Sequence, residues 1–192
     1  MKKSHILRAV GWFGVGLVAG AIVFLLQRSP HLTVVRPLGA GRPITPHRVE
    51  LHRYPLLPLT PGAVIPQGKP LLVNLWAPWC GPCLEEWQPL QNLSRRLESH
   101  GTATLGLAVA TNAAAARSFL HQHPSRYPVY LLRAHLRRLA TRLGIQVAGI
   151  PNTVLLSARG RVLLVVSGKL RAGDVKRFLD ALPKKERQSR IN

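Results

Sequence analysis

Cysteine and acidic residues are both scarce in this sequence. Its 192 residues include two cysteines, and seven Asp and Glu stand against 27 Lys and Arg. Two cysteines exclude a small domain held together by several disulfides, and they exclude a zinc or iron–sulfur site built from four cysteines of one chain. The positive charge does not indicate disorder, because 46% of the residues are hydrophobic. The length fits one domain with an extension.

Charged residues are absent from Ala9–Leu26, a mostly apolar run. As a helix it would reach about 27 Å, close to the thickness of a bilayer core. Lys2, Lys3 and Arg8 precede it, which favours a cytoplasmic N-terminus and an exported remainder. A cleaved signal peptide is the alternative, but no small-x-small cleavage site follows, and no cysteine near its end supports a lipoprotein. We expect residues 1–27 to be a membrane anchor.

The rest of the chain divides by composition into a linker, a domain and a tail. Residues 28–44 form a proline-rich linker, 45–183 the domain and 184–192 a basic tail. The apolar pieces Val49–Leu51 and Leu56–Leu59 suggest an edge hairpin at the start of the domain. Strands and helices then alternate, which predicts an α/β fold with a mixed sheet covered by helices on both faces. The expected strands are 70–76, 103–110, 129–132, 153–157 and 161–167, and the expected helices 84–97, 113–122, 135–143 and 173–182.

The two cysteines lie in the segment Trp79–Cys83 (WCGPC), between the first of these strands and its helix. At the start of a helix, unpaired N–H groups and the helix dipole stabilise the thiolate of Cys80. Cys83 follows one turn later, close enough to attack a mixed disulfide, and Pro82 suits the first turn. Half of a zinc site and two inert thiols are the alternatives. No histidine follows at zinc-finger spacing, and inert thiols would not explain the flanking tryptophans.

The block 74–83 (NLWAPWCGPC) and the segment 149–153 (GIPNT) resemble the thioredoxin superfamily, in particular its membrane-tethered TlpA/ResA/DsbE-like branch. The resemblance covers about residues 45–183. It implies a thioredoxin-like fold and a cis bond between Ile150 and Pro151 that faces the cysteines. It also assigns Cys80 and Cys83 as the catalytic pair, with no cofactor besides their disulfide and no metal.

Further residues take roles by the same resemblance. Trp79, Gly81, Pro82, Ile150 and Pro151 would contact the substrate. Glu86 matches the branch's C-x-x-C-x-x-E pattern and would carry the proton of the second thiol, although an acidic residue also suits a first helical turn for its charge alone. Asn74 stands where cytoplasmic thioredoxins carry a buried aspartate, so that proton route is absent.

These observations predict a thiol–disulfide oxidoreductase in a bacterial inner membrane, with its catalytic domain in the periplasm. Gly81-Pro82 is the dipeptide of thioredoxin, which favours a reductase, and a reductase there needs a membrane electron donor. The resemblance suggests apocytochrome c as a client. A thiol oxidant and a copper- or zinc-binding assembly factor using Cys80, Cys83 and a histidine are the alternatives. The basic composition suggests anionic lipid or an acidic client, and no motif for nucleic acid is found.

Overall fold

The computed structural model describes residues 48–109, 112–146 and 149–183. The expected anchor at 1–27, the linker at 28–44 and the tail at 184–192 lie outside these residues. Within the described part of the chain, no helix combines the length and the apolar character that a membrane span requires.

A six-stranded mixed sheet forms the centre of the domain, in the order β1-β4-β3-β2-β5-β6. Strands β2, β3 and β4 run parallel to one another, whereas β1, β5 and β6 each pair antiparallel with a neighbour. This arrangement confirms the predicted mixed sheet. The strand bounds are β1 Leu56–Pro58, β2 Leu71–Trp76, β3 Ala103–Ala108, β4 Val129–Leu132, β5 Asn152–Leu156 and β6 Val162–Ser167.

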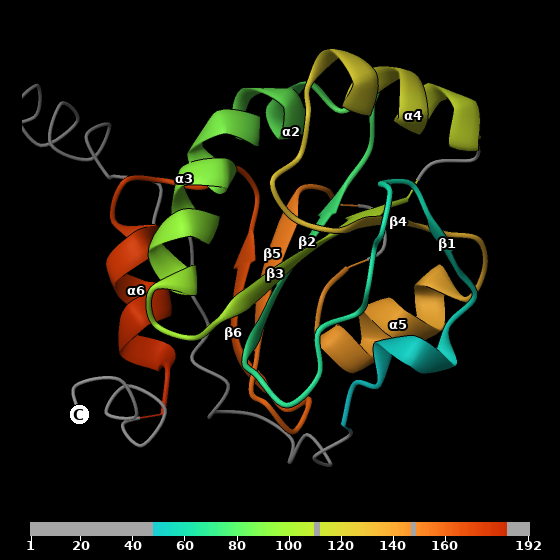
Figure 1. The fold of residues 1–192 in the computed structure, drawn as a ribbon. Helices are drawn as coiled ribbons and strands as arrows, with labels where there is room; N and C mark the ends of the chain where they lie inside the picture. The colour runs from blue at the N-terminus through green and yellow to red at the C-terminus, as the bar shows by residue number, and fades with distance from the viewer. Residues whose placement is uncertain (1–47, 110–111, 147–148, 184–192) are drawn as a thin grey trace, which may run out of the picture. The chain divides into compact units, whose positions relative to one another are not determined.

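Helices cover both faces of the sheet, as the sequence predicted (Figure 1). One face packs against α3, α4 and α6, with α2 leading into α3, and the other packs against α5 and the short 3-10 helix η1. The helix bounds are η1 Leu51–Arg53, α2 Gly81–Glu85, α3 Trp87–Glu98, α4 Ala113–Gln122, α5 Leu136–Leu143 and α6 Asp174–Ala181.

The central strand β2 is buried along its whole length. Successive side chains of a strand point to opposite faces. Leu72 and Trp76 therefore join the core beneath α3, whereas Leu71, Val73 and Leu75 join the core beneath α5. Asn74 lies between Leu72 and Trp76 in this alternation, so the strand directs a polar side chain towards α3.

The helix expected over 84–97 is divided at Glu86 into α2 and α3. Pro89 gives the physical reason, because it has no N–H to donate to the carbonyl of Glu85 four residues earlier. Glu86 keeps right-handed helical angles, and its carbonyl accepts a hydrogen bond from Leu90 N–H at 2.8 Å. The division leaves the Glu86 side chain buried at the junction.

The expected hairpin between Val49–Leu51 and Leu56–Leu59 is wrong. Val49 N–H instead donates to the carbonyl of Gly160 at 2.8 Å, and η1 then turns the chain towards the sheet edge. There β1 pairs antiparallel with β4, which has β3 on its other side. The strand β1 therefore pairs with the free edge of β4 and not with the apolar piece that precedes it in the sequence.

Candidate active site

The two cysteines form a disulfide where β2 passes into α2. Cys80 is the N-cap of α2, and its sulfur accepts a hydrogen bond from Cys83 N–H at 3.3 Å. Both cysteines are buried, with exposed fractions of 5% for Cys80 and 1% for Cys83. The hydrogen bond from Cys83 N–H would also stabilise a Cys80 thiolate after reduction, because an N–H donor favours an anionic acceptor.

The segment before β5 faces the disulfide from the other side of the site. The bond between Ile150 and Pro151 is cis, as the resemblance implied. The carbonyl oxygen of Ile150 lies 3.8 Å from the sulfur of Cys80. Residues 70 positions apart thus meet at one sulfur atom, which brings Cys80 together with Ile150 of the predicted substrate-binding set.

The remaining predicted substrate contacts are at the surface around the disulfide. Gly81 and Pro82 are exposed between the two cysteines. Trp79 is 70% exposed and Leu84 40% exposed, so two large apolar side chains flank the redox pair at the surface. Apolar side chains exposed together in this way are typical of a surface that binds another protein.

Glu86 is the buried acid of the site, with 1% of its surface exposed. Its carboxylate accepts hydrogen bonds from the Asn74 side-chain amide at 2.9 Å and from Leu170 N–H at 3.0 Å. Burial raises the pKa of Glu86, and this effect outweighs the two hydrogen bonds, which lower it. Smaller effects come from Asp174, which raises the pKa, and Lys169, which lowers it. A buried carboxylate with a raised pKa is suited to accept and release a proton.

Two hydrogen-bond partners of Glu86 and one nearby charge, Lys169, were not predicted from the sequence. Asn74 was noted only as a replacement for an aspartate, yet its amide joins Glu86 to the hydroxyl of Thr153 at 3.1 Å. Leu170 contributes its backbone, which leaves no signal in the sequence. Lys169 pairs with the exposed carboxylate of Glu85 at 2.5 Å, which fastens the segment between β6 and α6 to α2. The alternation of β2 was the one available signal, since it sets Asn74 on the face of Leu72 and Trp76.

Comparisons with known proteins agree with this geometry. The Redoxin family matches residues 65–182. The thiol:disulfide interchange protein DsbE of Escherichia coli K12 is 30% identical over 156 residues, which are 80% of each chain. The thiol-disulfide oxidoreductase ResA of Bacillus subtilis is 27% identical over 104 residues, 54% of this chain and 56% of ResA. The chain belongs to the Redoxin family, and within it to the ResA/DsbE-like thiol-disulfide oxidoreductases.

Solved structures show the same thioredoxin-like fold. A DsbF homologue from Corynebacterium diphtheriae has a TM-score of 0.55 at 23% identity, over 71% of this chain and 92% of that one. A secreted thiol-disulfide isomerase from Corynebacterium glutamicum has a TM-score of 0.52 at 24% identity, over 58% and 69%. The fold predicted from the resemblance is therefore confirmed.

Aromatic rings pack behind the site of this thiol-disulfide oxidoreductase. The rings of Trp76, Trp87 and Phe119 lie 5.0 to 5.1 Å apart, centre to centre. Tyr127 is buried next to Trp87, and burial raises the pKa of its hydroxyl, with the negative charge of Glu86 as a second cause. Tyr127 is the member of this cluster on which the charge of Glu86 acts.

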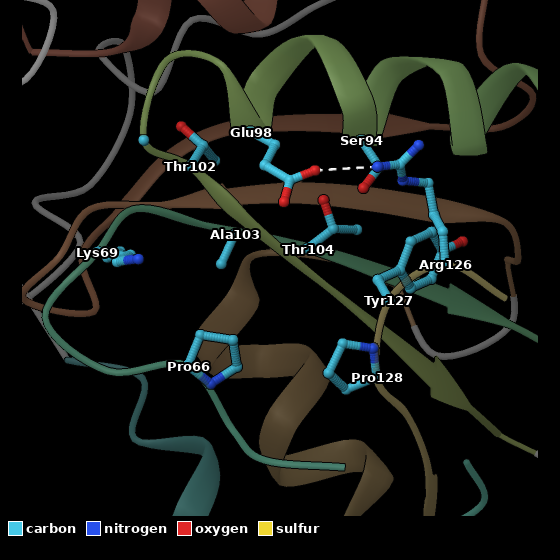
Figure 2. A pocket seen from close by; sticks show the side chains of 11 residues that line it. Pro66, Lys69, Ser94, Glu98, Thr102, Ala103, Thr104, Arg126, Tyr127 and Pro128 are labelled. Atoms are coloured by element: carbon cyan, nitrogen blue, oxygen red, sulfur yellow. Dashed lines mark hydrogen bonds and ion pairs between the residues drawn. The ribbon is translucent and has the colours of Figure 1, made fainter. Parts of the chain in front are cut away.

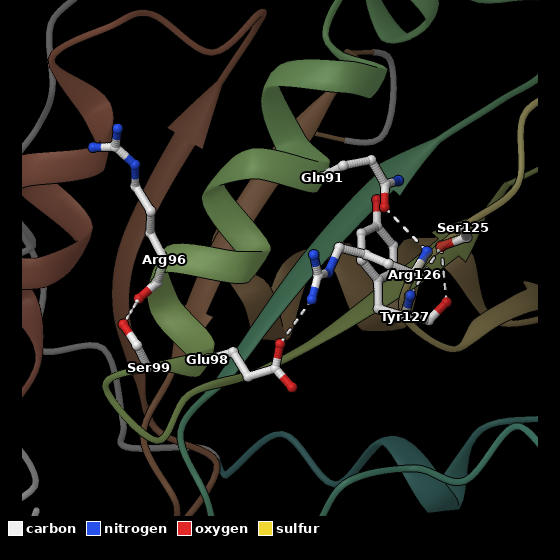
Figure 3. Close-up of polar contacts among 7 residues, drawn as sticks. All are labelled: Gln91, Arg96, Glu98, Ser99, Ser125, Arg126 and Tyr127. Carbon is white, nitrogen blue, oxygen red and sulfur yellow. Dashed lines mark hydrogen bonds and ion pairs between the residues drawn. The ribbon is translucent and has the colours of Figure 1, made fainter.

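A cavity of about 290 Å³ lies apart from the disulfide, between α3, the first residues of β3 and the segment before β4 (Figure 2). Its wall includes Thr104 and Tyr127, and an ion pair of 3.0 Å between Arg126 and Glu98 crosses it (Figure 3). Gln91 accepts a hydrogen bond from Arg126 N–H at 3.1 Å, which fixes this segment against α3. None of the predicted site residues lines the cavity.

Metal ligands do not gather in the described part of the domain. Over residues 48–109, 112–146 and 149–183, no group of three or more His, Cys, Asp and Glu is arranged to hold an ion. His123 packs its ring against Phe119 at 4.5 Å between centres.

Proposed function

We propose that this protein is a membrane-anchored reductase of disulfides in other proteins and works outside the bacterial cytoplasm. The observation that carries the proposal is the Cys80–Cys83 pair, which lies between the Ile150 carbonyl and a helix whose next turn holds the buried Glu86. A thiol nucleophile, a second thiol and a proton acceptor are the groups that disulfide reduction requires.

The reaction starts from the dithiol form. The Cys80 thiolate attacks one sulfur of the substrate disulfide, forms a mixed disulfide and releases the other sulfur as a thiolate. Cys83 loses its proton and attacks the Cys80 sulfur, which breaks the mixed disulfide and releases the second substrate thiolate. Two electrons pass to the substrate, and the enzyme is left with the Cys80–Cys83 disulfide.

Glu86 takes the proton of Cys83 in this scheme. It follows Cys83 by three residues, and its helical backbone continues from α2. The raised pKa brings the carboxylate closer to the range in which a group both accepts and returns a proton near neutral pH. Asn74 and Leu170 N–H fix the carboxylate during this exchange.

The surface around the disulfide would receive an extended substrate segment. Trp79, Gly81 and Pro82 form one side of this surface and the half-buried Ile150 the other, whereas Pro151, the next residue, is buried. The Ile150 carbonyl lies 3.8 Å from the Cys80 sulfur, so a substrate strand that pairs with this backbone would have its sulfur near the nucleophile. The exposed ring of Trp79 supplies apolar contact beside it.

The cellular setting follows from the sequence and the resemblance. We assign residues 1–27 as a single inner-membrane anchor, 28–44 as a linker, 45–183 as the periplasmic catalytic domain and 184–192 as a basic tail. In an oxidising compartment the enzyme must be reduced again, which calls for a membrane electron donor that acts by thiol–disulfide exchange. Apocytochrome c before haem attachment is the proposed client, so the protein would act in cytochrome c maturation.

Trapping in intact cells tests this function. Cys83→Ser leaves Cys80 able to form a mixed disulfide that cannot resolve, so client proteins should remain linked to it. The control is Cys80→Ser, which should trap none. The proposed client predicts that haem-free cytochrome c is among the linked proteins.

The redox state of the clients decides the direction of electron flow. A reductase should hold Cys80 and Cys83 mainly as thiols in growing cells, and its loss should leave client disulfides unreduced. A pair held mainly as the disulfide, with clients that lose disulfides when the gene is deleted, would identify a thiol oxidant instead.

A further inference from the structure

Positive side chains gather around α5, away from the disulfide. We call this surface the α5 basic face, and it consists of Arg48, Arg133, His135, Arg137, Arg138 and Arg142. All are exposed except Arg142, which is partly buried. Arg137, Arg138 and Arg142 lie on the side of α5 opposite to Leu139 and Leu143, which are fully buried.

In the part of the domain that the structure describes, carboxylates do not neutralise this surface. The segment 133–146 contains no Asp or Glu. Among the described residues, no ion pair involves Arg48, Arg133, Arg137, Arg138 or Arg142. The acidic residue nearest to Arg48 in the sequence is Glu50, which already pairs with Arg53 and His52. The concentrated positive charge is therefore available to a negatively charged partner.

The described chain begins on this surface. The side chain of Arg142 donates to the carbonyl of Arg48, the first described residue, at 3.5 Å. In the sequence, residues 27–47 join Arg48 to the apolar run at 9–26. Even fully extended, such a segment spans at most about 70 Å. A bilayer that held the apolar run would thus remain within short reach of Arg48, which favours weak surface binding through a high local concentration.

We propose that the α5 basic face binds the headgroups of anionic phospholipids in the membrane that holds the N-terminal anchor. The inference rests on the anchor assigned above and adds a partner surface to it. Lys and Arg side chains near a membrane surface are attracted to anionic headgroups by their charge. Because α2 and α5 lie on different sides of the domain (Figure 1), this contact leaves the surface around the disulfide open to a substrate.

Energy transfer in nanodiscs tests the contact with the full chain. Cys80→Ser and Cys83→Ser remove both native cysteines, so that Thr141→Cys, on the exposed side of α5, carries the only fluorophore. The acceptor is attached to lipid. Transfer should be strong with about 30% phosphatidylglycerol and weak in pure phosphatidylcholine or at high salt. A fluorophore at Asn92→Cys, exposed on α3, should show no such dependence.

Charge reversal supplies the matched comparison. R137E with R138E should reduce the ratio of docked to undocked domain about tenfold or more. R95E with R96E changes the charge equally on the exposed side of α3 and should leave that ratio unchanged. Equal effects of the two double variants, or transfer that does not depend on phosphatidylglycerol, would overturn the proposal.

The experiment distinguishes a wrong assignment of the membrane anchor from a wrong assignment of the α5 basic face. A chain that does not enter nanodiscs disproves the anchor but not the surface. Sedimentation of that chain with phosphatidylglycerol vesicles then decides. Binding that R137E with R138E abolishes supports the α5 basic face, and no binding overturns it.

Discussion

The side-chain amide of Asn74 donates a hydrogen bond to the carboxylate of Glu86 at 2.9 Å, inside the layer between the sheet and α3. Both residues are 1% exposed. The pair links the strand that precedes the redox disulfide to the helix that follows it. The protonation of Glu86 is thereby coupled to the stability of the fold as well as to the chemistry of Cys83.

The stability of the oxidised protein should depend on pH through Glu86. Burial raises the pKa of Glu86 above its ordinary value of 4.5, so the folded chain binds this proton more tightly than the unfolded chain does. The contribution is therefore most favourable below pH 4.5 and is lost as pH rises through the raised pKa, by up to about 1.4 kcal/mol per pH unit in that window. Glu86→Gln removes this loss of stability, because glutamine does not ionise. Asn74 can turn its amide to accept a hydrogen bond from the glutamine, so the buried pair keeps its contact.

Urea unfolding from pH 4 to pH 8 measures the effect. Glu86→Gln should be more stable than the wild type at pH 7, and the difference should shrink as pH falls. Glu98→Gln is the control, because its carboxylate is exposed and pairs with Arg126, which does not affect the pKa of Glu86. A difference between Glu86→Gln and the wild type that does not change with pH would contradict the prediction.

The same substitution should slow the second step of the reaction. Glutamine cannot accept the proton of Cys83, and positioned proton transfer typically contributes about 100-fold or more to a rate. We expect Glu86→Gln to form the mixed disulfide at the normal rate and to resolve it about 100-fold more slowly. Stopped-flow mixing of the reduced enzyme with a disulfide-bonded peptide separates the two steps. Equal slowing of both steps would argue that Glu86 acts on Cys80 or on the fold instead.

Removing the Asn74 amide should raise the pKa of Glu86 further. The hydrogen bond from Asn74 lowers that pKa, so Asn74→Ala takes away a group that stabilises the charged form. It should also cost about 1 to 3 kcal/mol of stability, because Thr153 and Glu86 lose a buried partner. Carbon-13 NMR titration of Glu86 measures the shift. Thr153→Val is the matched control, since it leaves the bond between Asn74 and Glu86 in place.

The sequence predicted the local features of this site better than its long-range contacts. The N-cap of α4 is an example, since Asn112 accepts a hydrogen bond from Ala114 N–H at 2.7 Å and asparagine is a preferred residue type at that position. Leu170 N–H reaches Glu86 across 84 residues, and a backbone donor has no residue type by which to recognise it. The cis bond at Pro151 could be expected only from the resemblance, because a proline alone rarely has this form.

Truncation of Trp76 should lower stability, whereas truncation of Trp79 should weaken substrate binding. Trp76 is 1% exposed and packs against Trp87 and Phe119, so Trp76→Ala should cost about 3 to 5 kcal/mol of stability. Trp79 is 70% exposed, so Trp79→Ala should change stability by less than about 0.5 kcal/mol. It should instead raise KM for a protein disulfide while leaving the reaction with a small disulfide unchanged. A large loss of stability in Trp79→Ala would refute a role confined to substrate binding.

Lys169 should adjust the proton affinity of Glu86 from the surface. Its positive charge lowers the pKa of Glu86, and its ion pair with Glu85 holds the segment that presents Leu170 N–H. Lys169→Met should therefore raise this pKa, so that the stability difference from Glu86→Gln extends to higher pH. The free energy of unfolding itself should fall by less than about 1 kcal/mol, because the ion pair is exposed. Lys176→Met removes an exposed lysine from α6 that also forms an ion pair, and it should not move the titration of Glu86.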